Sequence, residues 1–285
     1  MNTATPSAGG VLSPAAFLRQ ILARRRERVR QAQAVVSEAE LRRLAEGRRP
    51  RDFAAALRRP GAAPAIVAEL KRASPSRGRL RDDYDVPRLA GAYARAGAAA
   101  LSILTEEDYF LGSLEHLRQA RQTVALPLLR KDFVFSAYQI WEAAAAGADA
   151  VLLIAAMLDD VQLRALQAEA SAAGLAALVE VHDAAELARA LQAGARLVGV
   201  NNRDLRSFQV DPELCLRLAA ALPPEVVRVA ESGIGSPAML ARLKAAGYEA
   251  ALIGEHCMRA ADPGAALADL LAGVAAHAAA PGEQT

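Results

Sequence analysis

The sequence has few cysteines and no long apolar run, so it lacks the features that mark disulfide-stabilised, zinc-knuckle and membrane-spanning proteins. Its two cysteines, Cys215 and Cys257, stand far apart and form no CxxC pair, which argues against a disulfide framework or a zinc knuckle. The longest apolar runs are rich in alanine and are interrupted by charge well before the ~20 residues of a membrane helix. The N-terminal stretch MNTATPSAGG lacks the basic and then apolar order of a signal peptide. We therefore expect a cytoplasmic protein without a membrane segment.

A net charge of only +2 hides an uneven distribution, because residues 19–59 carry 13 Lys and Arg against 5 Asp and Glu. Such a basic segment suggests contact with nucleic acid or a membrane surface. However, no aromatic side chain interleaves with these arginines to stack on bases. Ser13 and Pro14 instead suit the start of a helix, and apolar residues follow at helical spacing at Leu18, Leu22, Val29, Ala32 and Val36. We predict a helix that packs on the main domain with its arginines in solvent, and no nucleic-acid partner.

From residue 64 onward, short β-like runs alternate with alanine- and leucine-rich helical segments that end near glycine. The eight runs are AIVAELK, AALSILTE, LPLLRKDF, AVLLIAA, AALVEVH, LVGVNNR, VRVAESG and AALIGEH. This alternation predicts a parallel sheet, and eight units in about 200 residues favour a closed (β/α)₈ TIM barrel over an open doubly wound sheet. No run is followed by GxGxxG, which also argues against a dinucleotide-binding fold.

The predicted fold class is therefore α/β, a TIM barrel with an N-terminal helical extension. We expect a disordered leader at 1–11, the helical extension packed on the barrel at 12–62, the catalytic barrel at 63–275 and a flexible tail at 276–285. Active sites of such barrels lie at the carboxyl ends of the strands. The polar residues of the eight runs gather at that end, whereas their amino ends are almost wholly apolar.

Side chains two residues apart on a strand point to the same face, so Glu69 and Lys71 share a face of the first run. By the same spacing, Lys131 shares a face with Leu129, and Glu180 with Leu178. We therefore predict a ring of acids, lysines and one amide above an apolar floor, made of Glu69, Lys71, Lys131, Glu180, Asn201 and Glu231. Burying an unpaired charge costs roughly several kcal/mol, so we expect the acids and lysines of the ring to pair with each other. Paired acids and bases in a partly dry site have shifted pKa values, which suits them to proton transfer.

Other residues near the strand ends suit a phosphorylated, flat substrate. The stretches ESGIGS and LIGEHC follow the last two runs, where barrels often bind phosphate through backbone N–H groups and helix N-termini. Phe110, Phe133 and Pro75 can form an apolar slot for a ring. We interpret His182, which has no second ligand at metal spacing, as a capping or packed residue, and we expect no metal site. Cys257 has no adjacent base and is interpreted as a buried apolar residue.

The motifs that follow the predicted strands resemble one known family in their order. IVAELKRASPSRGRL resembles the signature of indole-3-glycerol-phosphate synthase, a carboxy-lyase of tryptophan biosynthesis. LSILTEEDYFLGS, LPLLRKDF, LVEVH, VGVNNRDL, AESGI and LIGEHCMR resemble its later blocks, and the resemblance spans residues 12–269. It implies conversion of 1-(2-carboxyphenylamino)-1-deoxyribulose 5-phosphate into indole-3-glycerol phosphate, CO₂ and water without a cofactor. The expected partner is this phosphorylated small molecule, and we expect a monomer or a weak homodimer.

The resemblance also implies roles for the ring residues. Lys131 would be the general acid that protonates the substrate's ketone oxygen as the aromatic carbon attacks, and Glu180 the acid/base of the dehydration that follows. Lys71 would hold the anthranilate carboxylate. The groups that orient these side chains and the ribulose hydroxyls would be Glu69 and Asn201, with Glu231 assisting.

The same resemblance assigns a set of substrate-binding residues around the ring. A second anion contact would come from Arg203, and Ser74 would belong to the loop at the site. The ring pocket would be lined by Pro75, Phe110, Phe133 and Leu205. The phosphate would be held mainly by backbone N–H groups of Ser232, Gly233, Gly254 and Glu255. A small hydroxyl residue can follow the eighth-strand glycine in this family, so we expect the carboxylate of Glu255 to turn away from the phosphate.

Three alternatives remain at this level. A sibling barrel of the same pathway, such as phosphoribosylanthranilate isomerase or the tryptophan synthase α subunit, shares the phosphate site but needs different acid/base pairs. A non-catalytic barrel that binds a phosphorylated metabolite would not need an intact proton-transfer ring. A nucleic-acid scaffold would use the basic N-terminal helix and would bind with a steep salt dependence.

Overall fold

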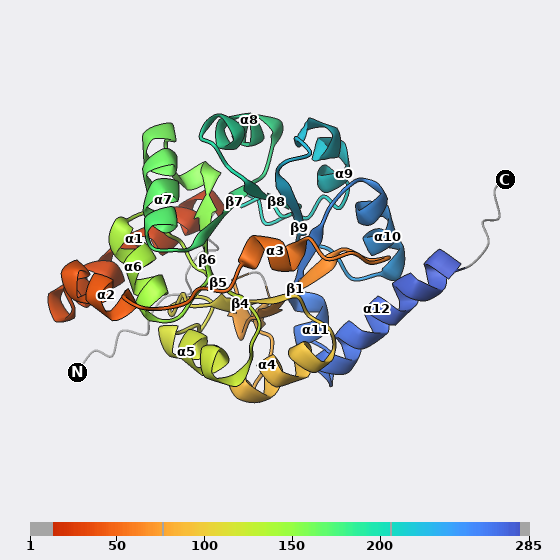
Figure 1. Ribbon diagram of the computed structural model, residues 1–285, viewed down its shortest axis with the longest axis horizontal. Coiled ribbons are helices and arrows are strands. Elements are labelled where there is room, and N and C mark those ends of the chain that lie inside the picture. The colour runs from red at the N-terminus through yellow and green to blue at the C-terminus, as the bar shows by residue number, and fades with distance from the viewer. Residues whose placement is uncertain (1–13, 76, 206, 280–285) are drawn as a thin grey trace, which may run out of the picture.

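The computed structural model describes residues 14–75, 77–205 and 207–279. The predicted leader, the cap residue Ser13 and residues 280–285 of the predicted tail lie outside these ranges. Eight parallel strands close into a barrel in the order β1-β10-β9-β8-β7-β6-β5-β4 (Figure 1). They are β1 (Ala65–Leu70), β4 (Ala100–Leu104), β5 (Leu128–Lys131), β6 (Ala150–Ile154), β7 (Ala176–Val181), β8 (Leu197–Asn201), β9 (Val227–Glu231) and β10 (Ala250–Ile253). Each predicted run contains one strand, and the TIM-barrel prediction is confirmed.

Helices cover the outside of the barrel. They are α4 (Val86–Arg95), α5 (Leu114–Thr123), α6 (Ala137–Ala145), α7 (Asp160–Ala172), α8 (Ala184–Gln192), α9 (Leu214–Leu218), α10 (Pro237–Ala245), α11 (Glu255–Met258) and α12 (Pro263–Ala279), with short 3₁₀ turns η1 (Ala155–Met157) and η2 (Ala219–Ala221). Three of these helices, α4, α6 and α8, end at an Ala-Gly-Ala sequence. The glycines of these sequences, Gly97, Gly147 and Gly194, have φ of 95°, 94° and 86°. Glycine reaches this left-handed region without a Cβ penalty, so the chain reverses tightly into the next strand.

One apolar cluster fills the barrel interior below the site. Val67, Leu129, Leu152, Leu178 and Val229 belong to it and are almost fully buried. The strand residues between them face outward and pack against the surrounding helices in a second cluster. Period-2 alternation therefore places the polar residues that end the strands directly above an apolar floor.

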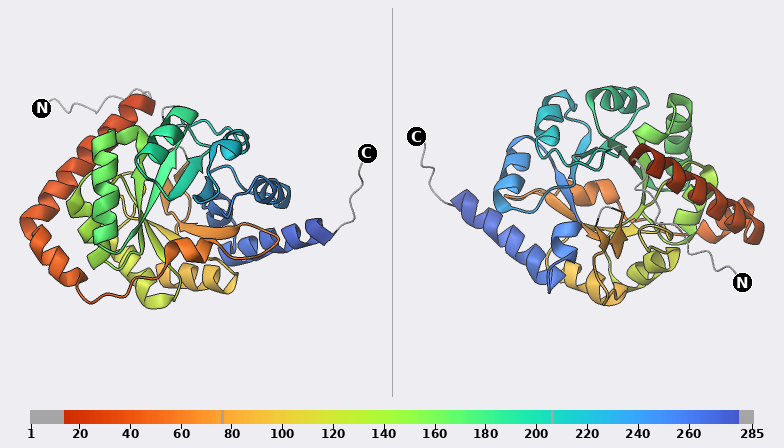
Figure 2. Two further views of the ribbon diagram at one scale, coloured as in Figure 1. Left: turned by 45° about the horizontal axis from the view of Figure 1, so that its top comes forward. Right: turned by 180° about the vertical axis from the view of Figure 1, so that it is seen from behind.

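Three helices precede the barrel: α1 (Pro14–Val35), α2 (Glu38–Ala45) and α3 (Phe53–Leu57). The short α3 contacts β1 and β4 and buries Phe53 and Leu57 in the interior cluster. Figure 1 shows α3 in front of the strands, and the right-hand view of Figure 2, from behind, shows α1 in front. The extension therefore contacts both ends of the barrel.

The face of α1 that packs on the barrel differs in part from the predicted one. Val29 is buried as expected, but Arg25 and Ile21, one and two turns before it, are buried too. Arg25 is only 3% exposed, so the expectation that the arginines of this helix stay in solvent is wrong for this residue. A buried guanidinium needs carboxylate partners, which the barrel supplies.

Two further details were not expected from the sequence. The loop after β1 folds as a small antiparallel hairpin, β2 (Ala73–Ser74) with β3 (Gly78–Arg79). Helix α12 continues to Ala279, so residues 276–279, assigned to the flexible tail, are helical. Within the described ranges, no helix combines the length and apolarity that crossing a membrane requires.

Candidate active site

A cavity of about 570 Å³ opens at the carboxyl ends of the barrel strands. All the residues selected from the sequence line it: Glu69, Lys71, Ser74, Pro75, Phe110, Lys131, Phe133, Glu180, Asn201, Arg203, Leu205, Glu231, Ser232, Gly233, Gly254 and Glu255. They come from seven strands and the loops that follow them. The structure therefore brings the predicted residues together, while their individual roles remain predictions.

Lys131, the last residue of β5, reaches across the barrel mouth to two carboxylates. Its Nζ lies 2.8 Å from Oε2 of Glu180 and 3.5 Å from Oε2 of Glu231. Both glutamates are 1% exposed and Lys131 is largely covered. Asn201 pairs in register with Glu231 on the neighbouring strand, and its Oδ1 accepts the backbone N–H of Arg203 at 3.0 Å.

The second lysine forms a separate pair on the first strand. Nζ of Lys71 lies 2.6 Å from Oε1 of Glu69, which confirms that the two side chains share a face. A buried strand can carry both charges here because β1 ends at the cavity, where Glu69 is 4% exposed but lies beside its ammonium partner.

Two glycines make the space that these acids occupy. A Cβ at Gly199 would lie 2.1 Å from Oε1 of Glu231, and one at Gly254 would lie 2.4 Å from Oε1 of Glu69. Any larger residue would have to displace a carboxylate from the ring. Gly199 and Gly254 are therefore required by the close approach of side chains, and neither has a positive φ.

The ring holds its members in different protonation states. Burial disfavours the ammonium of Lys131, but the carboxylates of Glu180, Glu231 and Glu69 hold its pKa above the ordinary range. Burial likewise disfavours the carboxylate of Glu180, yet Lys131 and His182 hold its pKa well below the ordinary range. Burial raises the pKa of Glu231 to about 8, and the nearby Glu180 adds to the rise. At neutral pH the site thus contains an ammonium, a carboxylate and a neutral carboxyl group in contact.

The loop after β9, where the sequence predicts the phosphate end of the site, has an unusual backbone. Ser232 and Gly233 both have positive φ, 64° and 72°. A non-glycine residue is strained there, and Asn202 supports it: Nδ2 donates to the carbonyl of Ser232 at 3.0 Å, and its N–H donates to the carbonyl of Glu231 at 2.9 Å. The expected phosphate end of the cavity is thereby held rigid.

Glu255, beside this loop, lies among three arginines. Its carboxylate is 3.1 Å from Nε of Arg77, 3.3 Å from Nη2 of Arg203 and 3.7 Å from Nη1 of Arg259. The three guanidinium groups come from the β1 loop, the β8 loop and the residue that follows α11. The Glu255 carboxylate therefore neutralises cations that face the cavity, and it links the β2–β3 hairpin to the opposite rim.

Aromatic side chains line the other part of the cavity. The rings of Phe110 and Phe133 lie with centroids 6.1 Å apart at 48°. The buried carboxylate of Glu106 holds the loop that carries Phe110, because it accepts the backbone N–H groups of Asp108, Tyr109 and Phe110 at 2.8–3.0 Å. Glu106 is thus a structural residue of this loop and does not line the cavity.

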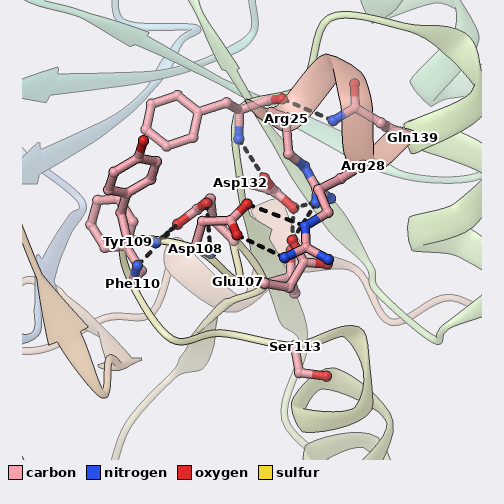
Figure 3. A network of polar contacts seen from close by, with 12 residues as sticks. Arg25, Arg28, Glu107, Asp108, Tyr109, Phe110, Ser113, Asp132 and Gln139 are labelled. Atoms are coloured by element: carbon pink, nitrogen blue, oxygen red, sulfur yellow. Dashed lines mark hydrogen bonds and ion pairs between the residues drawn. The ribbon is translucent and has the colours of Figure 1, made fainter. Parts of the chain in front are cut away.

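A buried ion-pair network connects α1 to the strand that carries Lys131. Asp132 Oδ2 lies 2.7 Å from Nη2 of Arg25 and 3.1 Å from Nη2 of Arg130, and it accepts the hydroxyl of Thr105 at 2.5 Å. The other Nη of Arg25 lies 2.6 Å from Glu107. Figure 3 shows Arg25 of α1 beside Glu107 and Asp132, which follow strand ends. Asp132 also accepts the N–H of Phe133 at 2.8 Å, so the network fixes the backbone next to Lys131.

Sequence reasoning missed some of the residues around the site. Arg77 and Arg259 line the cavity but were not selected. Arg77 lies in the SPSRG loop, where a cation next to a predicted anion site is a usable signal. The role of Arg25 had no such signal, because its carboxylate partner lies 107 positions away in the chain. Among the described residues, no group of His, Cys, Asp and Glu is arranged to hold a metal ion.

The sequence of this chain is similar to those of known proteins. A family model described as "Indole-3-glycerol phosphate synthase" matches residues 18–270. The chain belongs to this family. The indole-3-glycerol phosphate synthase of Albidiferax ferrireducens is 50% identical over 259 residues, which cover 90% of this chain and 98% of the relative. That of Carboxydothermus hydrogenoformans is 49% identical over 263 residues, 90% of this chain and 100% of the relative. The family resemblance and the lyase class predicted from the sequence are confirmed.

Similar solved structures are more distant and show the fold alone. A 3-hexulose-6-phosphate synthase from Salmonella typhimurium has a TM-score of 0.60 at 12% identity and covers 75% of this chain and 99% of that chain. A thiamine phosphate pyrophosphorylase from Pyrococcus furiosus has a TM-score of 0.57 at 18% identity, with 74% and 96% covered. Membership of the synthase family sets aside the sibling barrels considered above.

Proposed function

We propose that this chain closes the indole ring of 1-(2-carboxyphenylamino)-1-deoxyribulose 5-phosphate and releases indole-3-glycerol phosphate, CO₂ and water. The observation that carries this proposal is the placement of Lys131 in contact with Glu180 and Glu231, in a cavity that is also lined by an aromatic pair and by the loop after β9. Family membership supports the same reaction.

The use of lysine supports a proton-transfer role. The chain contains three lysines and 31 arginines, and two of the lysines, Lys71 and Lys131, lie in this cavity. An arginine remains protonated throughout the accessible pH range and is a poor proton donor, whereas a lysine can give up its proton when its surroundings change. Lys131, in a chain that otherwise prefers arginine, is thus suited to donate a proton.

Substrate binding follows from the two ends of the cavity. The flat anthranilate ring fits the slot lined by Pro75, Phe110, Phe133 and Leu205. Lys71 holds the ring's carboxylate. The phosphate binds at the N–H groups of Ser232, Gly233, Gly254 and Glu255, with Arg203 as a further cation. The groups that orient the acids and the ribulose hydroxyls are Glu69 and Asn201.

The chemistry needs a proton donor first and an acid/base pair afterwards. In ring closure, the aromatic carbon that bears the carboxylate bonds to the ketone carbon, and the ketone oxygen takes a proton from Lys131. The carboxylate then leaves as CO₂, and the electron pair of the broken bond restores the aromatic ring. In dehydration, Glu180 takes a proton from the neighbouring methylene carbon, and Glu231 protonates the leaving hydroxyl. Glu180 then returns a proton to Glu231, and solvent restores Lys131.

The test is to incubate the protein with this substrate and follow the fluorescence of the indole product. Lys131→Ala and Glu180→Gln should each lower kcat by at least about 10²-fold, because a general acid or base contributes about 10²–10⁴-fold. Lys244→Ala, the third lysine and outside the cavity, is the matched control and should turn over normally. Absence of product from the parent protein in any buffer, or near-normal turnover by Lys131→Ala, would contradict the proposal.

A further inference from the structure

His182 follows β7 directly and contacts two carboxylates at once. Its Nδ1 shares a hydrogen bond of 3.1 Å with Oε2 of Glu186, and its Nε2 lies at the ion-pair distance of 3.2 Å from Oε1 of Glu180 without hydrogen-bond alignment. The imidazole side chain is 5% exposed and does not line the cavity. His182 therefore touches the proposed acid/base from behind, on the side away from the substrate space.

The start of α8 holds Glu186 in place. Asp183 caps this helix and accepts the backbone N–H of Glu186 at 2.8 Å. The Glu186 carboxylate in turn accepts the backbone N–H of His182 at 2.9 Å, through the same oxygen that faces Nδ1. The helix N-terminus thus fixes a carboxylate, and the carboxylate fixes the imidazole ring.

The two contacts together define the protonation state of the ring. A neutral imidazole donates from one nitrogen only, and its other nitrogen would direct a lone pair at a carboxylate oxygen. Both ring nitrogens of His182 lie within ion-pair distance of carboxylate oxygens, and a positive charge on the ring, as in the imidazolium form, suits both contacts. Burial disfavours this cation, yet the two carboxylates raise the pKa of His182 to about 10.

We propose that His182 is a positioning residue: an imidazolium, held by Glu186, that ties Oε1 of Glu180 and leaves Oε2 directed at Lys131. The proposal rests on the role assigned to Glu180 in the proposed function. Without His182, the buried carboxylate would keep Lys131 as its cationic partner but would lose its orientation and part of its charge stabilisation. His182 is buried, as its interpretation as a packed residue implies, and the proposal adds a role for its charge.

Glu180 lies near the end of β7, and His182 is the first residue after that strand. The charged groups that face Glu180 are His182 beside it, Lys131 from β5 and Glu231 from β9. Those that face His182 are Glu180 and Glu186. Lys131 remains in His182 variants, so the contribution of the imidazolium can be measured separately.

The first experiment reads the imidazole directly in the substrate-free protein. The ¹⁵N chemical shifts of His182, assigned by comparison with His182→Gln, should show both ring nitrogens protonated from pH 6 to about pH 9. A single neutral tautomer at pH 8 would overturn the proposal. This measurement does not depend on turnover, so it remains decisive even if the proposed reaction is not found.

The second experiment separates positioning from a merely structural effect. In His182→Leu, kcat should fall roughly 10- to 100-fold with KM within about threefold, and the acid limb of the kcat profile should move up by about one pH unit or more. His182→Gln, which keeps a donor but not the charge, should retain more activity. His116→Leu, a histidine that packs on Tyr84 outside the cavity, is the matched control.

Each outcome of the kinetic experiment is informative. A parent-like kcat and acid limb in His182→Leu would overturn the proposal, and so would a fall in kcat that only follows a loss of folded protein. If that variant does not fold, His182→Gln and Glu186→Gln carry the test, and unchanged acid limbs in both would overturn it. Full turnover by Glu180→Gln would instead defeat the role of Glu180, and so distinguishes failure of the proposed function.

Discussion

Glu231 gives a prediction in which the sign and the size follow from the structure. Its side chain is almost fully buried, and Oε1 lies above Gly199 with no hydrogen-bond partner among the described residues. Burial, with Glu180 and Glu69 nearby, raises its pKa from 4.5 to about 8 although Lys131 opposes the rise. Glu231→Gln keeps the shape of the neutral carboxyl group and removes its titration.

The linkage between protonation and folding sets the sign. Because the folded-state pKa lies above the unfolded one, this group's contribution to stability is complete below about pH 4.5 and is lost as the pH rises towards 8. At about 1.4 kcal/mol for each pH unit inside this window, the parent protein should lose about 3 kcal/mol relative to Glu231→Gln between pH 5.5 and pH 9. The variant should therefore gain in relative stability as the pH rises.

The assay is urea unfolding followed by circular dichroism at intervals from pH 5.5 to pH 9, with the difference in unfolding free energy plotted against pH. Glu213→Gln is the control, because Glu213 is exposed and its pKa is lowered by a hydrogen bond to Arg242, so it does not titrate in this window. A flat difference for Glu231→Gln, or a variant that becomes relatively less stable at high pH, would refute the reasoning.

Two more predictions concern the surroundings of the cavity. Arg25→Met should lower the free energy of unfolding by about 3 kcal/mol in urea, because it leaves the buried Asp132 without one of its cations. Arg28→Met removes a more exposed pair on the same helix and should cost under about 1 kcal/mol; equal losses would contradict the burial argument. Glu255→Gln removes a charge at the proposed phosphate end, and should lower KM about two- to tenfold through reduced repulsion. A raised KM would instead show that the link between hairpin and rim matters more.

Much of the fold follows from local patterns. Eight apolar runs separated by helical segments define a parallel barrel, since strands of this composition are buried on both faces and each must be joined to the next by a crossover. The Ala-Gly-Ala sequences mark three helix ends because only glycine reverses the chain there without strain. The sequence did not predict the β2–β3 hairpin or the full length of α12, because neither has a distinctive local pattern.

Local patterns in the sequence also predict many residues of the site, but not the contacts between distant segments. Two residues of one strand, such as Glu69 and Lys71, share a face whatever the rest of the chain does. Glu180 lies near the end of β7 and His182 directly follows that strand, but the reason that His182 matters comes from the second carboxylate, Glu186, which the first turn of α8 directs back towards the strand.

By itself, the sequence determined the barrel, the end of it that carries chemistry and the family, because these depend on periodicity and on motifs within single segments. Only the tertiary structure decided which acid pairs with which base and which groups hold a proton. Lys131 meets Glu180 and Glu231 across strand boundaries. Burial keeps Glu231 neutral, whereas Lys131 and His182 keep the equally buried Glu180 ionised. Protonation depends on desolvation and on charges brought from distant parts of the chain, so it is a property of the folded barrel.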